Sequence, residues 1–192
     1  MPLPGPGTSP SRLSARTRPN VPDNRGPTAA PAYADRPSIR ATRAASIGLH
    51  TALDTSGFLG ARASDRLLAD TGLVLLDIKS FDVRTYRRLT GGDLAPTLSF
   101  ATRLDRLGVP VWLRYVLVPG WTDDPAAVDG LGGFLAGLGN VDRVDVLPFH
   151  RLGAHKYDAL GIPFPLRDTP TPAPGLVERV REQFREHGLR AL

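Results

Sequence analysis

The chain has 192 residues, with 24 Lys and Arg against 19 Asp and Glu, a net charge of +5, and no cysteine. This length fits one domain with or without a tail, and the lack of cysteine excludes disulfides, thiolate nucleophiles and Cys-ligated zinc or iron-sulfur clusters within this chain. There is no apolar run of about 18 residues and no apolar signal segment at the N-terminus, so we expect a soluble, cytoplasmic protein without a membrane span.

The net charge is confined to the N-terminal part of the chain. Residues 1–46 contain seven arginines and two aspartates, which leaves residues 47–192 neutral. Residues 1–37 contain nine prolines and one aromatic residue, so they cannot bury enough apolar surface to offset the entropy of ordering. We therefore expect residues 1–46 to be a disordered tail, with a short helical stretch at 38–46, and residues 47–192 to be the folded part. A basic tail can bind nucleic acid, but a solvated tail is the simpler interpretation, and the neutral folded part lacks the basic surface of a nucleic-acid binder.

Strand and helix signals alternate beyond the tail. An extended segment ends at Asp54, and Leu73–Lys79 is a short apolar run typical of a buried strand. The clearest strand lies between Pro110 and Pro119, and another covers residues 141–149. Helical spacing and boundary residues indicate helices near residues 63–70, 85–92, 98–107, 126–138 and 175–187, with a loop rich in Gly and Pro before the last. Repeats of about 25 to 40 residues are typical of βαβ units, so the pattern predicts an α/β fold with a parallel sheet.

Polar side chains stand at or just after the ends of the predicted strands. These are Asp54, Asp77 with Lys79, Arg114 and His150. Parallel strands bring their carboxyl ends to one edge, where α/β folds build their sites. Each residue also has a structural interpretation: Asp54 as a turn cap, Asp77 and Lys79 as an ion pair, Arg114 reaching toward solvent, His150 as a hydrogen-bonded rim residue. Together, carboxylates beside Lys and Arg suit a zwitterionic ligand, one that carries both an amine and a carboxylate.

Four segments, taken in order, carry a family resemblance. They are LHTALDTSG, LVLLDIK, VWLRYVLVPGWTDD and LPFHRLGAHKY. From about Ile47 to its end the sequence resembles the C-terminal part of the pyruvate formate-lyase activating enzymes, radical SAM proteins that activate glycyl radical enzymes. The resemblance implies a partial parallel (β/α) barrel, of which this chain holds about four βα units. It also implies S-adenosylmethionine (SAM), a 4Fe-4S cluster held by a CxxxCxxC loop, and a glycyl radical enzyme such as pyruvate formate-lyase as the partner.

The resemblance also implies roles for individual residues. Asp54, Thr55 and Asp77, with the backbone of Leu75, match residues that hold a monovalent cation beside the SAM carboxylate. Lys79 and His150 match groups that line the SAM and peptide site, and Arg114 and Val116 match positions that contact SAM.

The cysteine loop of the family has no counterpart here, nor has its GGE-type SAM amine motif. Where those units are expected, the chain has the Pro- and Arg-rich segment, so we expect a truncated or frame-shifted product that is inactive alone. The alternatives are a catalytically silent module that binds SAM or the glycyl radical enzyme, and nucleic-acid binding through the tail. Four strands fall short of a closed barrel, so the terminal strands near Asp54 and Val146 are expected to leave unpaired edges and to promote self-association unless something covers them.

Overall fold

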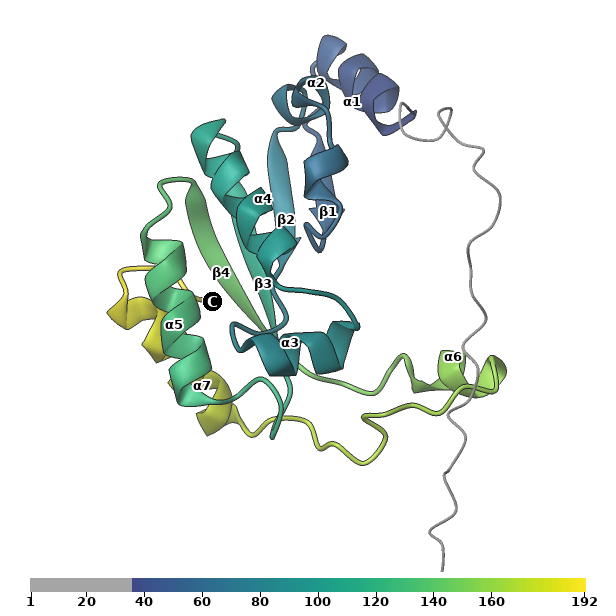
Figure 1. Ribbon diagram of the computed structural model, residues 1–192, viewed down its shortest axis with the longest axis vertical. Coiled ribbons are helices and arrows are strands. Elements are labelled where there is room, and N and C mark those ends of the chain that lie inside the picture. Colours follow the sequence, from purple (N-terminus) through teal and green to yellow (C-terminus); the bar gives the residue numbers. More distant parts are fainter. Residues whose placement is uncertain (1–35) are drawn as a thin grey trace, which may run out of the picture. The chain divides into compact units, whose positions relative to one another are not determined.

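The computed structural model describes residues 36–192. Four strands form one sheet in the order β1-β2-β3-β4, and every neighbouring pair is parallel (Figure 1). The strands are β1 (Ala52–Thr55), β2 (Leu73–Asp77), β3 (Val111–Leu117) and β4 (Val141–Pro148). The helical elements are α1 (Arg36–Ser46), η1 (Gly60–Arg62), α2 (Asp65–Ala69), α3 (Val83–Thr90), α4 (Ala95–Arg106), α5 (Pro125–Ala136), α6 (Ala154–Ala159) and α7 (Pro174–Glu186). The predicted α/β class with a partial parallel barrel is confirmed.

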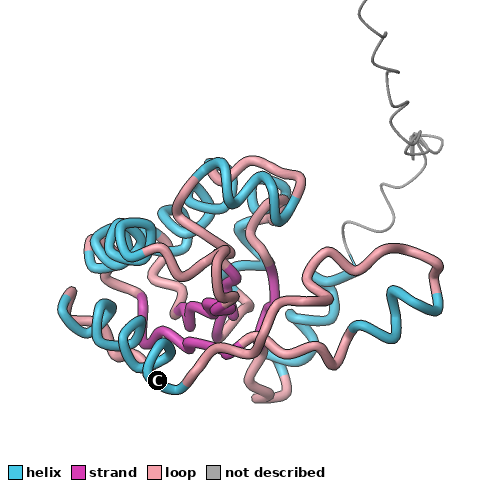
Figure 2. Tube along the Cα trace, turned by 90° about the horizontal axis from the view of Figure 1, so that it is seen from below, coloured by secondary structure: helices cyan, strands magenta, loops and turns pink. Residues whose placement is uncertain are grey.

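The two faces of the sheet differ because side chains alternate along each strand. In β3, Leu113, Tyr115 and Leu117 are buried, whereas Trp112 and Arg114 are half-buried on the other face. Helices α4 and α5 lie over the apolar face, and α7 contacts α5 and β4 (Figure 1). Viewed nearly along the strands, the sheet occupies the centre with helices packed around it (Figure 2). The core therefore lies on the helical side, and the other face is left to polar residues.

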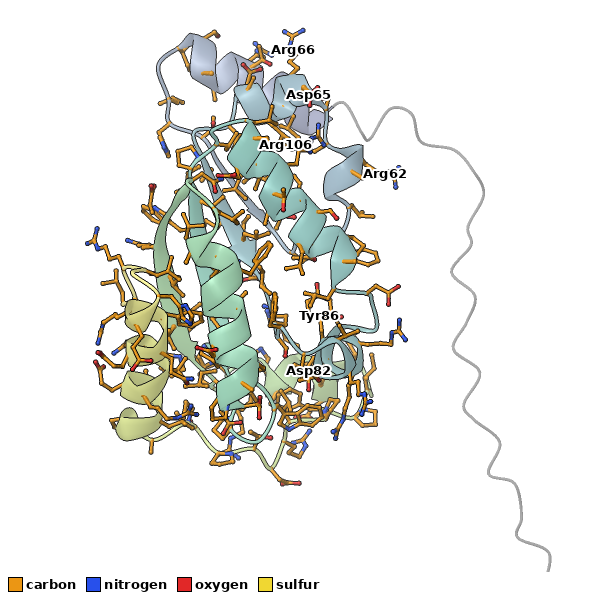
Figure 3. The ribbon with its side chains drawn as sticks, turned by 60° about the vertical axis from the view of Figure 1, so that its left-hand side comes forward. Arg62, Asp65, Arg66, Asp82, Tyr86 and Arg106 are labelled. Carbon is orange, nitrogen blue, oxygen red and sulfur yellow. The ribbon has the colours of Figure 1, made fainter. Side chains whose placement is uncertain are left out.

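Helix caps hold the loops at the carboxyl ends of β2 and β3. The carboxylate of Asp82 accepts a hydrogen bond from the Thr85 amide at 2.8 Å at the start of α3, and Asp124 does the same for α5. Asp82 and the α2 residue Asp65 mark opposite ends of the sheet (Figure 3). The Tyr86 hydroxyl lies 2.9 Å from the Thr97 hydroxyl and ties α3 to α4. These contacts hold α3, α4 and α5 in place beside the carboxyl ends of the strands, where the predicted polar residues lie.

Helix α1 lies within the segment predicted as a tail. It agrees with the helical stretch expected at 38–46 and contacts α2, where the Thr42 hydroxyl donates a hydrogen bond to the Asp70 carboxylate. The half-buried Ala41 and Ala44 explain this packing. The structure thus places a packed helix on the N-terminal side of the boundary predicted at residue 46. The disorder predicted for residues 1–35 lies outside the described residues.

The chain between β4 and α7 contains a short helix where only a loop was expected. Phe164 packs against Tyr157 of α6, with ring centroids 4.8 Å apart, and against Phe149 at 6.4 Å. These contacts across 15 residues or fewer of sequence organise a segment whose Gly and Pro content gave no helix signal. No helix within residues 36–192 is both long enough and apolar enough to span a bilayer.

The two edges of the sheet differ. The amide of Val144 in β4 donates to the carbonyl of Arg190 at 2.9 Å, and Leu192 donates to the Val144 carbonyl at 3.0 Å. The C-terminal residues therefore cover β4, which removes the open edge expected near Val146. Within the described part of the chain, β1 pairs with β2 alone.

Gly60 provides a test of the packing of η1 on α4. A Cβ atom at Gly60 would lie 2.2 Å from the ring of Phe100 and 2.6 Å from its Cβ, so Gly60→Ala must push α4 away. We expect the free energy of unfolding to fall by about 1–3 kcal/mol, the usual range for overpacking, as measured by urea denaturation. Gly175→Ala is the control, because a Cβ there meets nothing within 4 Å and alanine favours the first turn of α7. Equal stability of the two variants would contradict the packing described.

Candidate functional site

A network of charged side chains connects the first three strands on the polar face. Arg114 of β3 donates from Nε to Oδ1 of Asp77 at 3.0 Å and from Nη2 to Oδ2 at 3.2 Å. Its Nη2 also donates to the carboxylate of Asp54 in β1. The register explains the two-point contact with Asp77, because Asp77 and Arg114 are direct neighbours across β2 and β3. One guanidinium thus bridges two carboxylates from two other strands.

Lys79 extends this network at the carboxyl end of β2. Its Nζ lies 3.1 Å from Oδ2 of Asp77, and its side chain is 33 % exposed. Asp77 is therefore paired with two cations while only 19 % exposed. The sequence-based expectation that this carboxylate must be paired agrees with the geometry, since an unpaired charge in that position would be costly.

Electrostatics keep Arg114 charged. Burial lowers the pKa of Arg114, but the hydrogen bond to Asp54 and the charges of Asp77 and Asp54 together outweigh burial and hold that pKa above its usual value. The guanidinium therefore stays protonated throughout the pH range in which proteins fold. Asp54 is 61 % exposed, so the network is tight at Asp77 and open to solvent at Asp54.

The other predicted site residues divide into two groups. The structure places Leu75 and Val116 on the same face as Asp77 and Arg114, because each is two residues away along its strand. It does not bring the side chains of Thr55 and His150 to the network. Thr55 follows Asp54 directly in β1 and points to the other face, where its hydroxyl accepts from the Gly57 amide at 3.0 Å. His150 is exposed beyond the end of β4, and no hydrogen bond or ion pair within residues 41–192 joins it to the four charged residues.

A second charged group on the same face was not predicted from the sequence. Arg143 of β4 donates from Nη2 to Oδ2 of Asp145 at 3.1 Å, and its guanidinium lies 3.5 Å from the ring centroid of Trp112. Asp145 is also the register neighbour of Arg114 across β3 and β4. The signal was present in the alternation of Arg143 and Asp145 with the buried Val144 and Val146.

The polar face has the donor set for a zwitterion and not for a transition metal. Arg114 and Lys79 offer guanidinium and ammonium donors, and Asp54 and Asp77 offer acceptors. Within residues 36–192 no group of three or more His, Cys, Asp or Glu side chains is placed to hold a metal ion. The predicted monovalent cation site at Asp54, Thr55 and Asp77 is of another kind, and in this structure the Arg114 guanidinium lies against both of its carboxylates.

Comparison of the fold places it in a known class. No protein-family model matches the chain. The crystal structure of a domain of pyruvate formate-lyase-activating enzyme from Bacteroides vulgatus superposes with a TM-score of 0.65 and 20 % identity, over 82 % of this chain and 92 % of that one. A radical SAM methyltransferase from Sphaerobacter thermophilus gives a TM-score of 0.57 and 18 % identity over 76 % of this chain and 41 % of that one. The fold is that of the partial α/β barrel found in radical SAM enzymes.

Sequence comparison identifies relatives of this chain within that class of enzymes. The chain is 40 % identical over 143 residues to pyruvate formate-lyase 1-activating enzyme of Escherichia coli K12, which covers 73 % of this chain and 58 % of that enzyme. The chain is thus a relative of the pyruvate formate-lyase activating enzymes, and the resemblance carried by its four motifs is confirmed. It spans little more than half of the length of the relatives it matches.

The Arg114–Asp77 contact can be tested by a double-mutant cycle. We expect Arg114→Met to lower the free energy of unfolding by about 1–3 kcal/mol, because the half-buried Asp77 loses two charged hydrogen bonds. Asp77→Asn in the same chain should recover part of that loss. The readout is urea denaturation at pH 7.

Arg87→Met is the matched control for this cycle. This substitution breaks the ion pair between Arg87 and Asp93. Because the two side chains are 65 % and 61 % exposed, we expect little change in the free energy of unfolding. Additive losses in the double variant would show that Arg114 and Asp77 do not interact.

Proposed function

We propose that this chain forms the part of a glycyl radical enzyme activase that binds SAM and the partner enzyme, and that it carries out no radical chemistry by itself. The observation that carries the proposal is the bridge from Arg114 to Asp54 and Asp77, extended by Lys79. Its support is twofold: the chain is 40 % identical over 143 residues to a pyruvate formate-lyase activating enzyme, and the charges of the network complement an amino acid headgroup.

The charges of the network define how SAM would be held. The ammonium of the methionine part of SAM would meet Asp54 or Asp77, and its carboxylate would meet Arg114, Lys79 or a monovalent cation held at Asp54, Asp77 and the backbone of Thr55. Val116 and the backbone of Leu75 would line the same face, and His150 would lie toward the peptide of the partner. SAM, when bound, would supply a sulfonium centre that is open to reductive cleavage. The residues of this chain would bind and orient SAM. The exposed carboxylate of Asp54 leaves the network accessible to such a ligand.

The residues of this chain do not fit the iron-sulfur cluster of the family. A 4Fe-4S cluster is held by cysteine thiolates, and none of the 192 residues is cysteine. We therefore propose that the chain alone cannot cleave SAM by electron transfer.

The partner in this proposal is a glycyl radical enzyme, because the relatives are named for activation of pyruvate formate-lyase. Binding of that partner without catalysis is the second form of the proposal. The exposed apolar side chains of Leu152, Leu160 and Ile162 favour it, since they lie on the segment that follows β4. Nucleic-acid binding through residues 1–46 stays a prediction, because most of that segment lies outside the described residues.

Binding of SAM tests the first form of the proposal. We expect isothermal titration calorimetry to detect SAM binding to the full chain, and Arg114→Lys to weaken it at least tenfold, because a lysine cannot bridge Asp54 and Asp77 at the same time. Arg87→Lys should bind as the unaltered chain does, and circular dichroism checks that all three are folded. Equal affinity of the Arg114 and Arg87 variants would exclude the network as the SAM site.

Anaerobic reconstitution with iron and sulfide tests the claim of inactivity. We expect neither the absorbance nor the reduced-state EPR signal of a 4Fe-4S cluster, and no 5'-deoxyadenosine after addition of SAM and dithionite, because thiolate ligands are absent. The Escherichia coli relative, treated in parallel, validates the assay. Cluster signals together with 5'-deoxyadenosine from this chain alone would overturn the claim.

A further inference from the structure

All the hydrogen-bonding groups of Thr122, in the loop between β3 and α5, are used to hold the end of β3. Its hydroxyl accepts from the amide of Val118 at 2.8 Å and donates to the carbonyl of Val116 at 2.9 Å. Its amide donates to the carbonyl of Val118 at 3.0 Å, and its carbonyl accepts from the hydroxyl of Tyr115. Because Thr122 is only 2 % exposed, water does not compete for these bonds.

The hydroxyl of Thr122 takes the place of a missing strand partner. An amide of β2 donates to the carbonyl of Pro110, and in a parallel pair every second residue turns toward the same neighbour, so the backbone groups of Val116 and Val118 face the β2 side. The pairing of β2 with β3 ends at Arg114. Buried backbone groups beyond that point need another partner, and one hydroxyl supplies both an acceptor and a donor.

The loop that carries Thr122 is held from other directions as well. Arg179 of α7 donates from Nη2 to the carbonyl of Asp123 at 2.7 Å, and Asp124 caps α5. Burial raises the pKa of Tyr115, so its hydroxyl keeps its proton and remains a donor to Thr122. The loop therefore has one defined position relative to the end of β3.

Val116 lies on the polar face, just beyond the charged network. It follows Arg114 by two residues, as Lys79 follows Asp77, and Arg114 and Asp77 are register neighbours. Its side chain is half-buried, on the same face as that of Arg114. Val116 and Lys79 thus extend the polar face by the same step toward the carboxyl edge of the sheet, and a shift of the Val116 backbone would change the shape of that face.

We propose that Thr122 is a positioning residue of the SAM site, whose hydroxyl fixes the backbone of Val116 so that Val116 forms the wall of the site beside Arg114. The inference rests on the proposed function, because it takes SAM as the ligand of the polar face. Thr122 acts through Val116 and not by contact with SAM, since it is almost fully buried. Its hydroxyl can be removed by valine and retained by serine, which gives a matched pair of variants.

The first test needs no ligand and measures amide hydrogen exchange by NMR in the full chain. We expect Thr122→Val to speed exchange of the Val118 amide about tenfold or more, because that amide loses its acceptor, and Thr122→Ser to leave it within about twofold. The amide of Val111, which donates to the Asn140 carbonyl at 2.9 Å, is the internal reference. Equal exchange of the Val118 amide in the two variants would overturn the inference.

The second test measures SAM affinity by isothermal titration calorimetry, below the melting temperature of every variant. We expect Thr122→Val to weaken binding about tenfold and Thr122→Ser to restore it to within about twofold. Thr102→Val is the control, because it removes a hydroxyl that donates to a carbonyl within α4, at 3.1 Å and in an exposed position. A merely structural role would lower the melting temperature of Thr122→Val and leave the SAM affinity of the folded protein unchanged.

The route through Val116 is tested by combining two substitutions. Val116→Ala removes most of the wall that Thr122 holds, so adding Thr122→Val to it should weaken SAM binding less than about threefold. A full tenfold loss in that background would overturn the route through Val116. Should Thr122→Val fail to fold, Thr122→Cys, whose thiol is a weak donor and acceptor, should show the same changes to a smaller extent.

The outcomes separate this inference from the proposed function. A chain that binds no SAM overturns the proposed function and this inference together. A chain that binds SAM equally well with threonine, serine or valine at position 122 overturns this inference alone.

Discussion

The position of Arg114 between Asp54 and Asp77 is the interaction on which the polar face depends. Each of the first three strands contributes one of these side chains, so the contact requires parallel strands in this register. A shift by one residue would turn the charged side chains into the apolar core, since side chains alternate between the faces. The cost of burying an unpaired charge therefore makes the register a consequence of the charges as well as of the core.

Much of the fold could be predicted because its signals are local. The buried run Leu73–Lys79 and the segment between Pro110 and Pro119 contain β2 and β3, and the helical spacing of Leu98, Ala101 and Leu104 marks α4. Two features could not be predicted in this way. The cover of β4 by Arg190–Leu192 joins residues far apart in the sequence. Helix α6 depends on the packing of Tyr157 on Phe164, in a segment whose glycines and prolines favour a loop.

The candidate site shows the same division. Asp54, Asp77 and Lys79 could be placed together because parallel strands end at one edge. Arg114 was expected at that edge too, but it lies in the middle of β3 and meets Asp77 because the two are register neighbours. The alternation along β4 places Arg143 on the polar face, but its contact with Trp112 depends on the pairing of β3 with β4, which a single sequence does not contain. The assignment of Thr55 rested on the resemblance alone. Strand alternation separates its side chain from that of Asp54, so a role beside Asp54 would have to come from its backbone or from a turn of its hydroxyl away from Gly57.

A sheet of four strands exposes two surfaces that a closed barrel hides: the polar face and the outer edge of β1. The residues on these two surfaces differ. The polar face tolerates water because its charges are paired within the chain, through Arg114 with Asp77 and through Arg143 with Asp145. Within residues 36–192 the outer edge of β1 has no partner strand, so its outward amides and carbonyls need water or a partner from elsewhere. Water can satisfy these groups, but it cannot satisfy the apolar side chains of Ile47, Leu49 and Leu59 beside them. The polar face, by contrast, stays open to a ligand, because the carboxylate of Asp54 at its margin is 61 % exposed.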